Sequence, residues 1–306
     1  MIDAAGQLGI EFLGISQTER YTSGAYTAQV LLAMRERARV DAVLERHRTK
    51  PKPQGDPEER VSRLSEDEAI AARAAAEGSG AAAEDDGRAG GTYFPYRPYC
   101  SVCESDATTI IRYDDDTTAL TYVCECGHTE TVELSTNHRG KLVWKVDWPM
   151  RWAYEGVIFE PSGVDHQSPG SSFVVGGELV REIFDGEQPI GPMYAFVGIS
   201  GMAKMSSSKG GVPTPSDALE IMEPQVLRWL YARRKPQQSF TVAFDQEIYR
   251  LYDEWDALGR KVAEGTASPS HAAAFVRAVG TVAGPLPRTP LPRYCRSRRD
   301  PGERRG

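Results

Sequence analysis

Apolar positions recur along this chain with two periods, which predict where helices and strands lie. Between residues 24 and 48 they return every three or four positions among charged residues, and this predicts one long amphipathic helix. The apolar run GIEFLGIS at 9–16 predicts a short buried strand. Three runs rich in Thr, Tyr and Val between residues 93 and 137 (TTIIRY, TALTYVC and TETVELS) predict antiparallel strands.

Strand and helix patterns alternate in the middle of the chain. DWPMRWAYEG (147–156) predicts a short helix with Pro149 near its start, and SSFVVGGELVREIF (171–184) is helical towards its later end. VIFEPSG (157–163) and MYAFVGIS (193–200) predict strands. This alternation predicts an α/β sheet. Helical patterns dominate afterwards, over about 216–222, 224–234, 244–264 and 269–280.

Two segments have compositions that do not favour a packed structure. Residues 50–91 are rich in Pro, Gly, Ala and acidic residues, so they bury too little apolar surface to offset the entropy of ordering. They predict a flexible insertion with a transient helix near 66–77. The last segment holds seven arginines from Arg288 onward, which predicts either a disordered basic tail or an out-of-frame end of a coding region.

Composition narrows the class of protein. A chain of 306 residues with 40% hydrophobic residues is long enough for two packed domains. No apolar run approaches ~20 residues, and the first residues lack the basic region of a secretory signal, so we expect a cytoplasmic protein without a membrane span. The net charge of −7 argues against a general nucleic-acid coat. It is compatible with an RNA enzyme whose basic residues gather on one face.

Clustered cysteines predict a metal site. YCSVC supplies Cys100 and Cys103, and VCECGH supplies Cys124, Cys126 and His128 about twenty residues later. Two close pairs of soft ligands joined by a β-hairpin are typical of a structural zinc ribbon. Five donors compete for four places, so the fourth ligand stays open between Cys126 and His128. The alternative is a surface hairpin with four unligated thiols.

The stretch GISGMAKMSSSKGG at 198–211 predicts a phosphate-binding loop. It follows a predicted strand, and ligands of open α/β sheets bind at the carboxyl ends of strands. Lysines and serine hydroxyls suit a polyphosphate, and glycines allow the loop to close over it. Composition alone is more typical of an exposed linker.

The order of residues in this loop changes that balance. KMSSSK resembles the KMSKS signature of class I aminoacyl-tRNA synthetases. LVWKVDWPMRWAYEGVIFEPSGVDH, MYAFVGISGMAKMSSSKGG and the string from MEPQVLRWLYARRKP to ALGRKV resemble one family in particular. This is the class I lysyl-tRNA synthetase family, the archaeal-type enzymes also found in some bacteria. The resemblance covers roughly 1–49 and 93–290.

The resemblance implies a fold and a domain order. The fold class is α/β, with a partial Rossmann-like class I synthetase catalytic domain, an inserted zinc ribbon and a following α-helical domain. The implied segments are a remnant of the first half of the nucleotide-binding fold (1–49), the disordered insertion (50–92), the zinc ribbon (93–138), the second half of the nucleotide-binding fold with the KMSKS-like loop (139–212), a helical stem-contact domain (213–282) and the tail (283–306).

The resemblance also implies a reaction. Lysine would be activated with ATP and Mg²⁺ to lysyl-adenylate and then transferred to tRNA(Lys). The loop would stabilise the pyrophosphate leaving group, with Lys209 as the main phosphate contact and Lys204 as the alternative. In the same loop Ser206 and Ser208 would bind phosphate, and Met205 would anchor the loop by packing.

Two further motifs carry expected substrate contacts. In the related enzymes the WPMRW segment lines the cleft, which implies that Trp148 closes over the lysine side chain by packing and cation–π contact. The strand-end motif GVDHQSPGSS would bring Asp165 and His166 to the lysine amine and the adenylate. Each has a structural alternative, since tryptophans four apart on a helix are usually core and an Asp–His neighbour pair is often structural. Asp147 and Arg151 have the spacing of an ion pair.

LRWLYARRKP concentrates basic side chains directly after the loop. Such a run is usually a solvated helix face. In an acidic protein it also suits phosphates of the tRNA acceptor stem. The residues of this predicted tRNA contact are Arg228, Arg233, Arg234 and Lys235.

The HIGH-type signature of class I synthetases does not occur in the sequence. We therefore expect an incomplete site with weak or no activity, unless a complementary polypeptide supplies the other half. Two alternatives to the ligase are a non-catalytic tRNA-binding or regulatory fragment and a glutamyl-type class I synthetase. The strings quoted above favour lysine.

Overall fold

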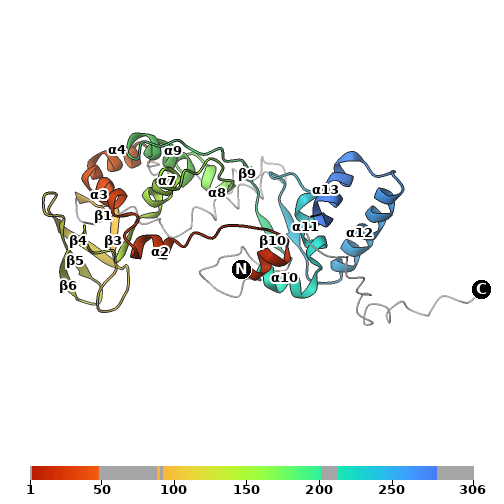
Figure 1. Cartoon of the computed structure of the whole chain (residues 1–306), viewed down its shortest axis with the longest axis horizontal. Helices are drawn as coiled ribbons and strands as arrows, with labels where there is room; N and C mark the ends of the chain where they lie inside the picture. Colours follow the sequence, from red (N-terminus) through yellow and green to blue (C-terminus); the bar gives the residue numbers. More distant parts are fainter. Residues whose placement is uncertain (1, 48–87, 90–91, 201–212, 281–306) are drawn as a thin grey trace, which may run out of the picture. The chain divides into compact units, whose positions relative to one another are not determined.

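The computed structural model describes residues 2–47, 88–89, 92–200 and 213–280 (Figure 1). These residues form two compact units. The ribbon unit comprises the described parts of 13–197 and 236–240, and the helical unit comprises those of 1–12, 198–235 and 241–280. Each unit has its own hydrophobic core.

The ribbon unit begins with three helices, α2 (Gln17–Thr22), α3 (Thr27–Arg35) and α4 (Arg37–His47). The prediction of one helix over 24–48 is wrong, because the chain leaves the helical conformation at Glu36. Arg37 explains part of the break: its guanidinium donates a 2.7 Å hydrogen bond to the carbonyl of Met34, which would otherwise take a helical partner. Apolar residues of both helices still enter one core.

The predicted buried strand at 9–16 is also wrong. Its residues have no strand conformation, and the side chain of Leu13 is 89% exposed. A strand needs hydrogen-bond partners on a neighbouring strand, and no such neighbour pairs with this run among the described residues. Its last residue, Ser16, instead caps α2 by accepting a 3.2 Å hydrogen bond from the backbone of Glu19.

The predicted antiparallel strands are confirmed. β4 (Thr108–Tyr113), β5 (Ala119–Cys124) and β6 (Thr129–Glu133) form one sheet with β5 in the centre. Leu120, Tyr122 and Cys124 alternate along β5 on its buried face. Two antiparallel pairs complete the ribbon region, namely β1 (Arg88–Ala89) with β2 (Thr92–Tyr93) and β3 (Tyr96–Pro98) with β7 (Gly140–Leu142).

Helix α7 (Trp144–Glu155) packs against α9 (Ser172–Glu182) (Figure 1), and it carries the three tryptophans of the unit. It starts three residues earlier than predicted, so Pro149 lies inside the helix and not near its start. It ends at Gly156, whose φ of 65° is left-handed and suits glycine. α9 is helical throughout, and not only towards its later end.

A short parallel pairing follows α7. β8 (Ser162–Gly163) lies parallel to β9 (Met193–Tyr194), and Phe159 forms a further parallel bridge with Ile190. The α/β class is therefore confirmed at this level. Both predicted strands are shorter than expected, and the second is divided into β9 and β10 (Val197–Ile199). α8 (Val164–Gln167) follows β8 directly.

The predicted C-terminal helices are confirmed in the helical unit. They are α10 (Pro215–Ile221), α11 (Pro224–Ala232), α12 (Glu247–Ala263) and α13 (Pro269–Val279), with β11 (Phe240–Val242) paired to β10. Val226, Trp229 and Trp255 lie in its core. Helix α1 (Ile2–Gln7) also belongs to this unit and packs against α10.

Several predictions fall outside the described residues. They are the flexible insertion with its transient helix, the basic tail and the loop residues 201–212. Among the helices that the structure describes, none combines the length and the apolar character needed to cross a membrane.

Candidate functional site

Three tryptophans on α7 stand one turn apart and form an aromatic wall with Phe173 of α9. Trp144 stacks on Trp148, with ring centres 5.0 Å apart and planes 22° apart. Trp148 in turn contacts Trp152 at 5.1 Å, and Phe173 meets both rings at 5.8 and 5.1 Å. Trp148 is only 7% exposed, whereas Trp144 is 40% exposed. Trp144 is therefore the indole of the wall that offers most surface to a ligand.

Asp165 and His166 lie beside this wall in α8, at the carboxyl end of β8. The imidazole of His166 is 5.5 Å from the ring of Trp148 and 6.5 Å from that of Trp144. Nε2 of His166 is 3.9 Å from the carboxylate of Asp165, and both side chains are more than one third exposed. The structure thus gathers Trp148, Asp165 and His166 in one place.

Trp144 was missed in the sequence analysis. The signal was available, since LVWKVDWPMRW repeats tryptophan at intervals of four residues and so places all three on one helix face. What the spacing does not give is the exposure. The indole of Trp144 is the accessible one, and the buried indole of Trp148 packs against both Trp144 and His166.

An ion pair between a half-buried guanidinium and a buried carboxylate lies beside the aromatic wall on α7. Arg151 binds Asp147 at 2.7 Å, which confirms the predicted pair, and Cζ of Arg151 lies 5.3 Å from the centre of the Trp144 ring. Tyr21 of α2 donates a hydrogen bond to the same carboxylate. Burial raises the pKa of Asp147 and, together with the charge of Asp147, that of the Tyr21 phenol. This network contacts the aromatic wall through the guanidinium of Arg151.

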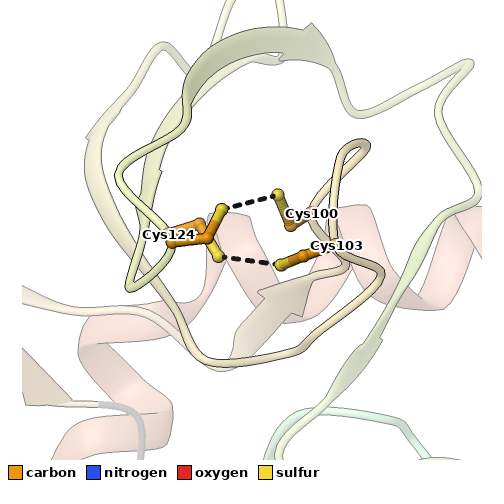
Figure 2. A group of neighbouring side chains, drawn as sticks. Cys100, Cys103 and Cys124 are labelled. Atoms are coloured by element: carbon orange, nitrogen blue, oxygen red, sulfur yellow. Dashed lines mark hydrogen bonds between the residues drawn. The ribbon is translucent and has the colours of Figure 1, made fainter.

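The second cluster consists of the four cysteines of the ribbon region. Figure 2 shows the thiols of Cys100, Cys103 and Cys124 turned toward one another. Sγ of Cys103 is 3.5 Å from Sγ of Cys124, and Sγ of Cys100 is 3.7 Å from Sγ of Cys126. All four sulfurs lie within 4.8 Å of one another. The four cysteines are free thiols, with no disulfide among them.

These distances fit a tetrahedral metal site. Metal–sulfur bonds of about 2.3 Å give a tetrahedron whose sulfur–sulfur edges are about 3.8 Å. The backbone N–H groups of Cys103 and Val102 lower the pKa of the Cys100 thiol to about 6, whereas the neighbouring thiols and desolvation raise the pKa of Cys103 and of Cys124. His128 is engaged elsewhere, since its Nε2 lies 3.2 Å from Oγ of Ser101. The arrangement favours Cys126 over His128 as the fourth ligand.

Comparison with known proteins decides the family. A sequence model described as "tRNA synthetases class I (K)" matches residues 1–281. The chain belongs to the class I lysyl-tRNA synthetase family. The lysine–tRNA ligase of Streptomyces coelicolor is 67% identical to it over 294 residues, which are 95% of this chain and 49% of the relative.

More distant members of the lysyl-tRNA synthetase family match as well. The lysine–tRNA ligases of Treponema pallidum and Pyrococcus horikoshii are each 33% identical, over 83% of this chain and 41% and 42% of their own lengths. The chain thus spans about half of the length of the curated relatives that it matches, or less. The resemblance stated from the sequence is confirmed.

The family's KMSKS-like loop lies outside the described residues, and with it Lys204, Met205, Ser206, Ser208 and Lys209. What the structure does describe is the chain on either side of it. β10 ends at Ile199, and α10 begins with a capping box between Thr214 and Asp217. The roles of these loop residues remain predictions.

The four basic residues predicted to contact tRNA have different surroundings. Arg228 donates a 2.6 Å hydrogen bond to the carbonyl of Leu8, and Arg233 pairs with Glu254 at 2.5 Å while lying over Trp229. Burial lowers the pKa of Arg234. Lys235 is exposed. Arg228 and Arg233 thus have roles within the helical unit, and Lys235 is the most accessible of the four.

Proposed function

We propose that this chain carries the lysine-activating part of a lysine–tRNA ligase. The reaction joins lysine to ATP as lysyl-adenylate, with release of pyrophosphate, and then transfers lysine to tRNA(Lys). The observation that carries the proposal is the 67% identity to the Streptomyces coelicolor ligase over 95% of the chain. The grouping of Asp165, His166 and the aromatic wall at the end of a parallel strand agrees with it.

The first step needs orientation and charge stabilisation more than proton transfer. A carboxylate oxygen of lysine attacks the α-phosphorus of ATP, and the bond to pyrophosphate breaks. In our proposal the exposed carboxylate of Asp165 attracts the lysine ammonium, and His166 donates to the ribose or to the adenylate phosphate. The exposed indole of Trp144, backed by Trp148, packs along the lysine side chain and adds cation–π attraction.

The KMSKS-like loop acts on the leaving group. Lys209, or alternatively Lys204, neutralises charge on the pyrophosphate as it separates, and Ser206 and Ser208 donate hydrogen bonds to its oxygens. Met205 anchors the loop by packing. ATP enters with its Mg²⁺, whose charge adds to that of the lysines.

We also propose a structural zinc ion held by Cys100, Cys103, Cys124 and Cys126. A closed set of four thiolates leaves no position for substrate, so the metal supplies stability to the small ribbon sheet and takes no part in the reaction. The tRNA acceptor stem meets the helical unit, with Lys235 as a phosphate contact.

The test is lysine-dependent exchange of pyrophosphate into ATP. Because the chain spans half of the relative, residues 1–281 replace the matching segment of the Streptomyces coelicolor ligase, and the exchange is measured with and without tRNA(Lys). We expect activity with lysine close to that of the parent, and a loss of two or more orders of magnitude after Lys204→Ala with Lys209→Ala. Exchange that depends on glutamate, or that is indifferent to both lysines, would refute the proposal.

A further inference from the structure

One side chain ties the α8 turn to both parallel strands. The amide nitrogen of Gln167 donates a 2.8 Å hydrogen bond to Oγ of Ser162 and a 2.9 Å hydrogen bond to the carbonyl of Gly191. Ser162 is the first residue of β8, and Gly191 precedes β9 by two residues. Gln167 itself comes directly after Asp165 and His166.

This side chain supplements a very short ladder. β8 and β9 pair over two residues each, Ser162 with Met193 and Gly163 with Tyr194. The backbone hydrogen bond from Ser162 to the carbonyl of Pro192 is long, at 3.3 Å. Two paired residues per strand and one further bridge, Phe159 with Ile190, give little cooperative stability. The two bonds from Gln167 therefore contribute a large share of the hydrogen bonding that joins α8 to the strands.

Gly191 connects the aromatic wall to the clamp, by which we mean the two hydrogen bonds from Gln167 to Ser162 and Gly191. A Cβ at Gly191 would come within 2.2 Å of the ring of Phe173 and 2.8 Å of the carbonyl of Glu160, so the backbone fits closely under that ring. Phe173 contacts both Trp148 and Trp152. The carbonyl that Gln167 holds is thus fixed relative to the wall.

The turn is also held from its other end. The hydroxyl of Ser171 donates to the carbonyl of His166, and that of Ser168 donates a 3.1 Å hydrogen bond to the carbonyl of Val164. The exposed side chains of Asp165 and His166 therefore project from a turn whose backbone is hydrogen-bonded on both sides. The two side chains approach each other at 3.9 Å, and His166 also contacts the rings of Trp144 and Trp148, so the position of the turn sets where both side chains point.

We propose that Gln167 is a positioning residue for lysine activation, which holds Asp165 and His166 in register with the aromatic wall. The inference rests on the proposed function. The chemistry requires an amide, because the Gly191 carbonyl only accepts and a single NH₂ group supplies both hydrogens. Glutamate at this position presents oxygens to that carbonyl, and methionine presents no donor at all.

The test compares Gln167→Met and Gln167→Glu with Gln188→Met in the chain itself. Gln188 lies in the same unit and donates one amide hydrogen bond to the carbonyl of Phe173, so its loss controls for a general loss of stability. The first measurement is hydrogen–deuterium exchange of the peptide spanning 162–167. We expect exchange about tenfold faster in both Gln167 variants, with β4, β5 and β6 unchanged.

The second measurement is affinity for lysyl-sulfamoyl-adenosine, a non-hydrolysable mimic of lysyl-adenylate, beside affinity for ATP. We expect the Gln167 variants to bind the mimic about 10- to 100-fold more weakly and ATP within about twofold of the unsubstituted chain, since one to two hydrogen bonds of positioning are lost. Gln188→Met should leave both affinities unchanged. A merely structural Gln167 would weaken both ligands together or neither.

The outcomes of these measurements separate the positioning role of Gln167 from the proposed function of the chain. Unchanged exchange at 162–167 overturns the clamp, and faster exchange with unchanged affinity for the mimic overturns the positioning role. Failure of both the unsubstituted chain and its chimera with the Streptomyces coelicolor ligase to bind the mimic overturns the proposed function, and the positioning role falls with it. In that case the exchange measurement still decides whether the clamp exists.

Discussion

The phenol of Tyr21 donates a 2.5 Å hydrogen bond to Oδ1 of Asp147, a buried carboxylate 126 residues further along the chain. The same phenol oxygen accepts a 3.1 Å hydrogen bond from the backbone N–H of Leu142. The other carboxylate oxygen binds Arg151 at 2.7 Å. The phenol of Tyr21 and the guanidinium of Arg151 thus each bind one oxygen of the Asp147 carboxylate, next to the aromatic wall.

Tyr21→Phe should destabilise the ribbon unit. It removes one hydrogen bond to a buried charge and leaves the N–H of Leu142 without its partner, at a cost of about 2–4 kcal/mol. Urea unfolding followed by tryptophan fluorescence measures the loss. Tyr154→Phe is the matched control, because the ring of Tyr154 also packs here and its hydroxyl makes no hydrogen bond among the described residues. Equal stability of the two variants would contradict the assigned role.

The contact between α4 and α9 should weaken in acid. The hydrogen bond from Arg46, at 2.8 Å, lowers the pKa of Glu178, and His47 contributes through a second bond at 2.8 Å. A carboxylate whose pKa is lowered on folding stabilises the protein above its unfolded pKa, near 4.3, and loses that contribution as the pH falls through the folded pKa.

Unfolding free energies of Glu178→Gln and the unsubstituted chain between pH 7 and pH 3 measure this effect. We expect the difference to stay level down to about pH 5 and to shrink steadily below about pH 4.5. Glu187→Gln, at an exposed residue without an ion pair in the described part of the chain, should show no such trend. A difference for Glu178→Gln that is independent of pH would contradict the role of this charge.

Metal content should separate the two candidates for the fourth ligand. We expect about one zinc per chain, a loss of most of it in Cys126→Ser and its retention in His128→Ala, since His128 bonds to Ser101. Mass spectrometry under native conditions reads the stoichiometry directly. Chelation should abolish hydrogen-exchange protection in β4, β5 and β6 and leave α11, α12 and α13 protected. Zinc loss from His128→Ala alone would favour the other ligand set.

Binding of tRNA should depend on Lys235 more than on Arg228. Lys235→Ala removes one exposed phosphate contact, so the dependence of log affinity on log salt should fall by about 1. Arg228→Met removes the bond to the carbonyl of Leu8 and should leave this slope unchanged, while making residues 2–8 easier to proteolyse. Filter binding over a salt series measures both variants. A lower slope for Arg228→Met would place that guanidinium on the nucleic acid.

The spacing of apolar residues, cysteines and prolines along the chain predicted the strands of the ribbon region and the C-terminal helices. The ribbon strands follow from alternation and from the spacing of Cys100 and Cys124, and the C-terminal helices follow from their apolar period and from prolines at their starts, such as Pro224 and Pro269. The period gave no sign of the break at Glu36. Ala33 and Val40 are seven positions apart, which a continuous helix also satisfies.

Other features depend on contacts that no local pattern contains. The run 9–16 has the composition of a strand, and whether it becomes one depends on a neighbour that it lacks here. Spacing placed the tryptophans on one face without showing which is exposed. In the same way, Arg228 has the sequence signature of a solvated basic face, and only the folded unit brings it to the carbonyl of Leu8.

That bond has a consequence for synthesis on the ribosome. Helix α1 is made before its partners in the helical unit, and Arg228 follows 220 residues after Leu8. At the usual elongation rates of about 5–20 residues per second, α1 waits about 10–40 s before its partners emerge. The ribbon unit has time to fold in that interval, so α1 packs into the helical unit only after the segment that follows it has folded.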